Sequence, residues 1–65
     1  MSHLIREIQD SGKLVILDDG SKWEIGIFDS METRMWMRMD RIDVSLGKLT
    51  NLSQRNKSVD ARRKL

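Results

Sequence analysis

The clearest periodic signal in the chain is a pair of apolar segments on either side of an Asp-Gly dipeptide. Residues 14–17 precede the dipeptide and residues 22–25 follow it. Asp-Gly is favoured in tight hairpin turns, so the pattern predicts a β-hairpin with a two-residue loop at positions 19 and 20. In that register the buried face is expected to consist of Leu14, Ile16, Trp23 and Ile25, with Ile27 continuing it past Gly26.

Other short strands are expected before and after this hairpin. Residues 4–8 fit both a helical stripe and a strand, and we favour the strand because a turn cluster at 10–12 lets them pair with the next segment. Residues 41–46 alternate, and shorter strands are expected at 49–52 and 58–62. The expected inward side chains of these three strands are Ile42, Val44, Leu46, Val59 and Ala61.

Helical structure is expected at one place only. Asp29 and Glu32 have the spacing of a capping box, which predicts a single short turn. A sheet of five or six short strands with no long helix to cover it must curl and cover itself. The sequence therefore predicts an all-β fold, a small barrel of the Src-homology-3-like or oligonucleotide-binding-like kind, as one domain over residues 1–65 with residues 63–65 as a frayed basic tail.

The most unusual stretch of the chain interleaves methionine with tryptophan and arginine. Met35, Met37 and Met39 alternate as the buried face of a strand would. This alternation predicts that the methionines fill the core, while Trp36 closes a barrel end or lies outside between Arg34 and Arg38. An exposed tryptophan flanked by arginines is typical of a contact surface, because both residue types are enriched among those that dominate interface energy.

The size of the chain limits its core. With 65 residues and no cysteine, the protein has neither disulfides nor thiolate metal ligands. Its single histidine, His3, lies near an end expected to be mobile, so we expect no metal site and no cofactor. A partner subunit is the support that stays open for so small a core.

Charge is unevenly distributed along the chain. Residues 1–46 contain six basic and nine acidic residues, whereas residues 47–65 contain six basic residues and one acidic residue. The first part therefore carries about −3 and the last about +5. Such asymmetry is typical either of a contact for nucleic acid or of a solvated tail.

Catalysis is not indicated by any motif. Nucleophilic catalysis needs a nucleophile beside an oriented base, and the chain has one terminal histidine and no cysteine. The neighbouring carboxylates Asp18 and Asp19, and the pair Asp40 and Asp43, are typical of turn chemistry. We expect no enzyme activity.

These observations favour a non-catalytic binding or assembly module that self-associates through an apolar patch including Trp36 and nearby methionines. The alternative is an oligonucleotide- or nucleotide-binding barrel. The partner is then the protein itself, another protein or a nucleic acid. The residues expected to make the contact are Arg34, Trp36, Arg38, Arg55, Lys57, Arg62, Arg63 and Lys64.

No apolar run approaches the roughly 20 residues that a membrane-spanning helix needs, and no signal segment is evident, so we expect a cytoplasmic protein without membrane contact.

Five separated segments together suggest a relationship. They are Asp-Asp-Gly-Ser-Lys-Trp-Glu-Ile at 18–25, Trp36, the segment 40–44, Lys48-Leu49-Thr50-Asn51, and Val59-Asp60-Ala61-Arg62. Across residues 4–62 this layout resembles short bacterial proteins of unassigned function that look like small β-barrels. The resemblance implies a fold, and it carries no catalytic or binding residues with it.

Overall fold

The computed structural model describes residues 2–65, which form six strands and two short helical turns. The elements in chain order are β1 (Ser2–Gln9), the 3-10 turn η1 (Asp10–Gly12), β2 (Leu14–Leu17), β3 (Lys22–Ile25), α1 (Ser30–Thr33), β4 (Arg41–Ser45), β5 (Lys48–Asn51) and β6 (Lys57–Lys64).

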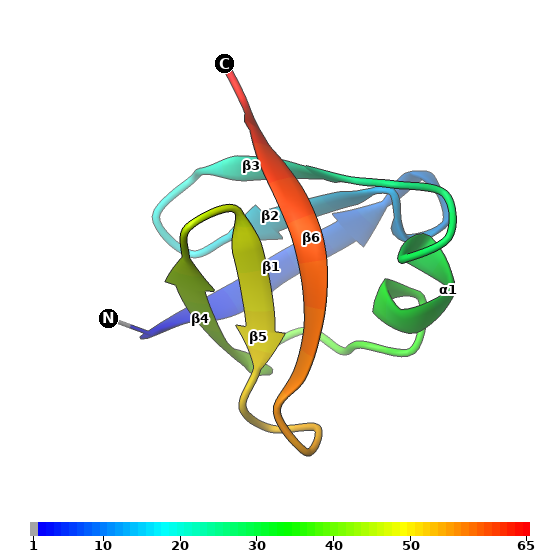
Figure 1. The fold of residues 1–65 in the computed structure, drawn as a ribbon. Coiled ribbons are helices and arrows are strands. Elements are labelled where there is room, and N and C mark those ends of the chain that lie inside the picture. The colour runs from blue at the N-terminus through cyan, green and yellow to red at the C-terminus, as the bar shows by residue number, and fades with distance from the viewer. Residues whose placement is uncertain (1) are drawn as a thin grey trace.

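The strands close into one antiparallel barrel in the order β1-β2-β3-β6-β5-β4 (Figure 1). β1 to β3 form one meander and β4 to β6 a second, and the pairs β1–β4 and β3–β6 join the two. α1 lies in the connection between the meanders, on the side of the barrel opposite the N-terminus (Figure 1). The expected all-β small barrel is confirmed. Closure lets a short sheet bury its own inner face.

The barrel encloses a small core of aliphatic side chains and one indole. Half-buried side chains from β1, β3, β4 and β6 pack against its edge. The buried hydrophobic residues are Ile5, Val15, Leu17, Ile25, Trp36, Ile42, Leu49 and Val59.

The expected register of the central hairpin is wrong by one residue. Ile16 pairs with Lys22 and not with Trp23. Residues 18–20 form a three-residue loop: Gly20 N–H donates to the Leu17 carbonyl, and Gly20 has a φ of 86°. This is a type I turn followed by a bulge, which adds one residue to the expected loop. Since side chains alternate along a strand, the slip turns Val15 and Leu17 into the core in place of Leu14 and Ile16, while Ile25 is buried as expected.

The expected sides of the methionine segment are also reversed. Trp36 is 4% exposed, whereas Met35, Met37 and Met39 are 66–71% exposed. Residues 34–40 form turns and no strand, so their side chains do not alternate between inward and outward positions as they would along a strand.

Two smaller expectations fail at strand ends. Leu46 is fully exposed because β4 ends at Ser45 and Leu46 lies in the turn to β5. The tail expected to fray at residues 63–65 is in fact strand as far as Lys64, which pairs with Lys22 of β3. Arg63 and Lys64 take part in closing the barrel, because they pair with β3 and β6 is the strand that joins β3 to β5.

Candidate functional site

The connection between the two meanders is a helical segment longer than α1 itself. Backbone hydrogen bonds run from Met31 N–H to the Phe28 carbonyl and, at the other end, from Trp36 N–H to the Thr33 carbonyl. Residues 28–36 are therefore wound helically. Their buried side chains are Ser30, Thr33 and Trp36, spaced three residues apart, and this spacing places them on one face.

The buried face of this segment is held mostly by polar contacts. Thr33 Oγ1 donates hydrogen bonds to the carbonyls of Gly12 and Ser30, and Ser30 Oγ donates to the Ile27 carbonyl at 2.7 Å. Gly12 has a φ of 87°, and a side chain there would lie 2.7 Å from the Ser30 carbonyl oxygen. Only glycine permits the close approach of η1 to α1.

The solvent side of the same segment is apolar. Phe28, Met31 and Met35 are spaced at i, i+3 and i+7, and they are 87%, 63% and 71% exposed. Ile27, which precedes them, is 68% exposed, so its expected inward position is wrong. We call Ile27, Phe28, Met31 and Met35 the apolar face. A shallow groove runs along it, and the lining of the groove also includes Lys13 and Arg34.

The segment that follows the helix is tied to the barrel through the carboxylate of Asp40. Oδ2 of Asp40 accepts hydrogen bonds from Asn51 Nδ2 at 2.9 Å, Gln54 Nε2 at 2.8 Å and the Met37 N–H at 3.0 Å. Burial alone would raise the pKa of Asp40, but the hydrogen bonds from Asn51, Met37 and Gln54 outweigh it and hold the pKa below its ordinary value. A charged Asp40 therefore fixes the turn between Trp36 and β4.

The residues expected to make the functional contact are only partly brought together. Trp36 is in the core, where its indole N–H donates to Glu32 Oε2 at 3.0 Å, so it is not a contact residue. Arg34 and Arg38 are exposed, and Arg34 lines the groove beside the apolar face.

The basic residues of the C-terminal part lie in two separate places. Arg55 lies in the turn before β6 and Lys57 begins that strand, whereas Arg62, Arg63 and Lys64 are near its other end (Figure 1). Lys57 and Lys64 are seven positions apart along β6, a span of about 23 Å at the usual rise of a strand. In the register between β3 and β6, Arg62 also lies directly opposite the acidic residue Glu24. The C-terminal basic residues expected to make the contact are therefore not gathered in one place.

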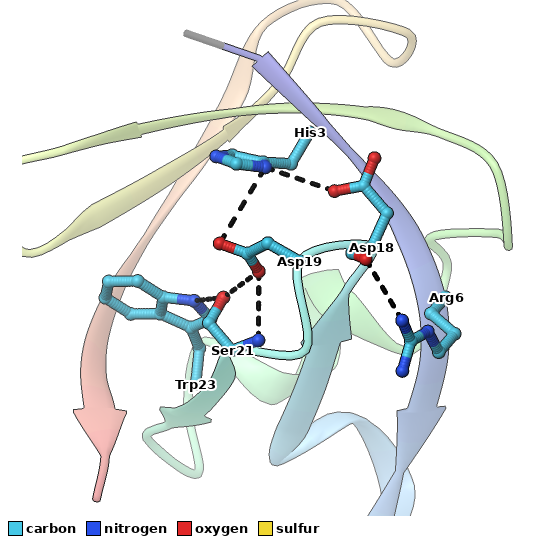
Figure 2. Close-up of polar contacts among 6 residues, drawn as sticks. All are labelled: His3, Arg6, Asp18, Asp19, Ser21 and Trp23. Carbon is cyan, nitrogen blue, oxygen red and sulfur yellow. Dashed lines mark hydrogen bonds and ion pairs between the residues drawn. The ribbon is translucent and has the colours of Figure 1, made fainter.

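A second polar cluster lies at the tip of the β2–β3 hairpin (Figure 2). His3 Nδ1 is 3.1 Å from Asp18 Oδ1 and 3.9 Å from Asp19 Oδ2. Asp19 Oδ1 accepts hydrogen bonds from the Ser21 hydroxyl at 2.6 Å and from the Ser21 N–H at 2.9 Å. These bonds, with smaller contributions from His3 and Arg63, hold the pKa of Asp19 below its ordinary value.

Trp23 borders this cluster and is half-buried at the edge of the core, not within it as expected. Its indole N–H donates to Ser21 Oγ at 2.9 Å (Figure 2). His3 is anchored because β1 pairs His3 with Ile42 of β4, which corrects the expectation of a mobile end. The three side chains of His3, Asp18 and Asp19 offer one nitrogen and two carboxylates within 4.8 Å of one another, a donor set suited to a metal ion.

The apolar face was not anticipated from the sequence. Its signal is nonetheless present, since Phe28, Met31 and Met35 have helical spacing and span the capping-box residues, Asp29 and Glu32, that predict the turn. Within residues 2–65, the structure contains no helix of the length and apolar character that a membrane span requires.

No family model, curated protein or solved structure matches the chain. The resemblance to short bacterial barrel proteins stays a prediction.

Proposed function

We propose that the protein is a non-catalytic assembly module that self-associates through the apolar face. One observation carries the proposal: residues 28–36 bury Ser30, Thr33 and Trp36 against the barrel and leave the stripe of Phe28, Met31 and Met35 in solvent. A surface helix of a monomer ordinarily buries its apolar stripe. An exposed apolar stripe is expected where a partner covers it.

The amount of exposed apolar surface supports this proposal. Among residues 2–65, nine large hydrophobic side chains are exposed while eight hydrophobic side chains form the core. Burying a side chain of this kind contributes at most about 1.5–3 kcal/mol. Four such side chains from each of two copies would contribute at most about 12–24 kcal/mol, a range that reaches above the estimated cost of association of about 4–15 kcal/mol.

A second copy of the same chain fits the chemistry of the groove. Lys13 and Arg34 line it beside Ile27, Phe28 and Met31. In a twofold contact each copy supplies the same apolar surface, and the flexible methionines adapt to each other.

A concentration series of the native mass, measured by sedimentation, tests the proposal. We expect the mass to rise toward that of a dimer with concentration, and Met31→Glu to return it to that of a monomer because a charge would be buried. Leu46→Glu is the matched control, since Leu46 is fully exposed on a different turn and its replacement should leave the dimer intact. The proposal fails if the wild-type chain stays monomeric at all concentrations. A monomer that gains mass only with single-stranded nucleic acid would favour the oligonucleotide-binding alternative.

A further inference from the structure

We propose that His3, Asp18 and Asp19 form a binding site for one divalent transition-metal ion of the zinc class. The cluster lies at the tip of the β2–β3 hairpin (Figure 2), on the side of the barrel opposite α1 (Figure 1), so the proposal is independent of self-association through the apolar face.

The spacing of the donor atoms fits such an ion. Ligand atoms bonded to tetrahedral zinc at about 2.0–2.2 Å lie about 3.3–3.5 Å from one another. His3 Nδ1 lies 3.1 Å from Asp18 Oδ1 and 3.9 Å from Asp19 Oδ2, so the two separations bracket that range. His3 Nδ1 therefore needs to shift by only a few tenths of an ångström relative to either carboxylate oxygen, and the two carboxylate oxygens, which lie within 4.8 Å of each other, close on the ion as it binds.

The chemistry of the donors selects the class of ion. An imidazole nitrogen with two carboxylate oxygens suits zinc and its first-row neighbours, whereas calcium and magnesium prefer oxygen donors alone. Without an ion, Nδ1–H of His3 donates to the Asp18 carboxylate. A metal ion on Nδ1 takes the place of that proton, and the neutral imidazole then carries its one N–H on Nε2.

The ligands are held in place before an ion arrives. The Asp18 N–H donates to the Leu4 carbonyl at 2.9 Å, which ties the hairpin tip to β1. The two hydrogen bonds from Ser21 occupy Oδ1 of Asp19 and leave Oδ2 facing His3. The Trp23 indole N–H in turn fixes the Ser21 hydroxyl. Groups that orient metal ligands in this way strengthen binding. Three protein ligands leave further positions on the ion open to water or to another donor.

Calorimetric titration of the tag-free chain with zinc chloride tests the site. We expect one ion per chain, and we expect His3→Ala and Asp19→Asn each to weaken binding at least tenfold. Asp10→Asn is the matched control and should leave the affinity unchanged, because Asp10 is an exposed carboxylate in η1, outside the cluster. The chain has a single histidine, so no other imidazole competes. Ser21→Ala should weaken binding about 10- to 100-fold by freeing Asp19.

A measurement on the wild-type chain does not depend on the folding of any variant. Adding zinc should shift the indole N–H resonance of Trp23, which is connected to Asp19 through Ser21, and leave that of Trp36, which is bonded to Glu32, in place. Absence of saturable binding at one ion per chain overturns the proposal. So does binding that His3→Ala leaves unchanged, or a titration in which the Trp23 resonance does not move.

Discussion

The indole N–H of Trp36 donates a hydrogen bond of 3.0 Å to the carboxylate of Glu32, four residues earlier in the chain. This bond spans one helical turn, and Trp36 itself is 4% exposed. It satisfies the polar edge of a ring whose body lies in the core. The same helical winding turns Met35, the adjacent residue, to solvent. The position of one indole thus explains why the apolar face is outside.

Trp36→Ala should lower the free energy of unfolding by about 3–5 kcal/mol, because removing a buried aromatic side chain leaves a cavity. Met35→Ala is the matched control and should change it by less than about 0.5 kcal/mol, because Met35 is 71% exposed. Denaturant unfolding of both variants, at a concentration where the chain is monomeric, provides the measurement. Equal stability of the two variants would contradict the placement of Trp36.

The hairpin register predicts a difference in stability between alanine variants of Leu17 and Leu14, the two leucines of β2. Leu17→Ala should destabilise by about 2–5 kcal/mol, because Leu17 is completely buried. Leu14→Ala should cost about 1 kcal/mol or less, because Leu14 is half-buried and lies outside the packed core. Thermal unfolding of the two variants measures this. If Leu14→Ala were the more destabilising variant, the register with a two-residue loop would be the correct one.

The sequence located this hairpin but could not determine its loop length. Asp-Gly is compatible both with a two-residue turn and with a type I turn followed by a glycine bulge. The strand before the turn is apolar on both faces, with Leu14 and Ile16 alternating with Val15 and Leu17, so its hydrophobicity did not select the register. The barrel selects it, because only one face of β2 can turn inward.

The methionine segment shows a different limit. Met35, Met37 and Met39 suit a strand, while Phe28, Met31 and Met35 suit a helix, and Met35 belongs to both patterns. Contacts distant in sequence decide between them, namely Thr33 with Gly12 and Asp40 with Asn51. The barrel itself was predictable, because strand number and turn spacing depend on local signals. The candidate sites were not, because they depend on which segments the barrel brings together.

The close contact between η1 and α1 predicts that Gly12→Ala destabilises more than Gly20→Ala. Both glycines have positive φ, at 87° and 86°, so both variants incur a backbone cost of about 1–2 kcal/mol. At Gly12 the new methyl group would also lie within 3 Å of the Ser30 carbonyl and the Arg34 amide, whereas nothing lies within 4 Å at Gly20. Differential scanning calorimetry should give a lower Tm for Gly12→Ala, and equal Tm values would contradict the packing described.

Asp40 predicts a dependence of stability on pH. Since the pKa of Asp40 is lower in the folded state, the unfolded state takes up its proton first as the pH falls. Its contribution is therefore complete above the ordinary carboxyl pKa of about 4 and is lost as the pH drops below that value. Asp40→Asn should reduce stability by about 1–3 kcal/mol at pH 7 and flatten the decline in acid. Some decline should persist, because the pKa of Asp19 is also lowered. An unchanged acid profile in Asp40→Asn would contradict this role.

Methyl NMR of the methionines over a dilution series reports on self-association through the apolar face residue by residue. Met31 and Met35 belong to the apolar face, while Met39 lies beyond it, in the turn to β4 where its N–H donates to the Ile5 carbonyl. Self-association through the apolar face predicts that the methyl resonances of Met31 and Met35 shift with concentration and that the resonance of Met39 shifts much less. Resonances of Met31 and Met35 that stay fixed while the native mass rises would show that another surface makes the contact.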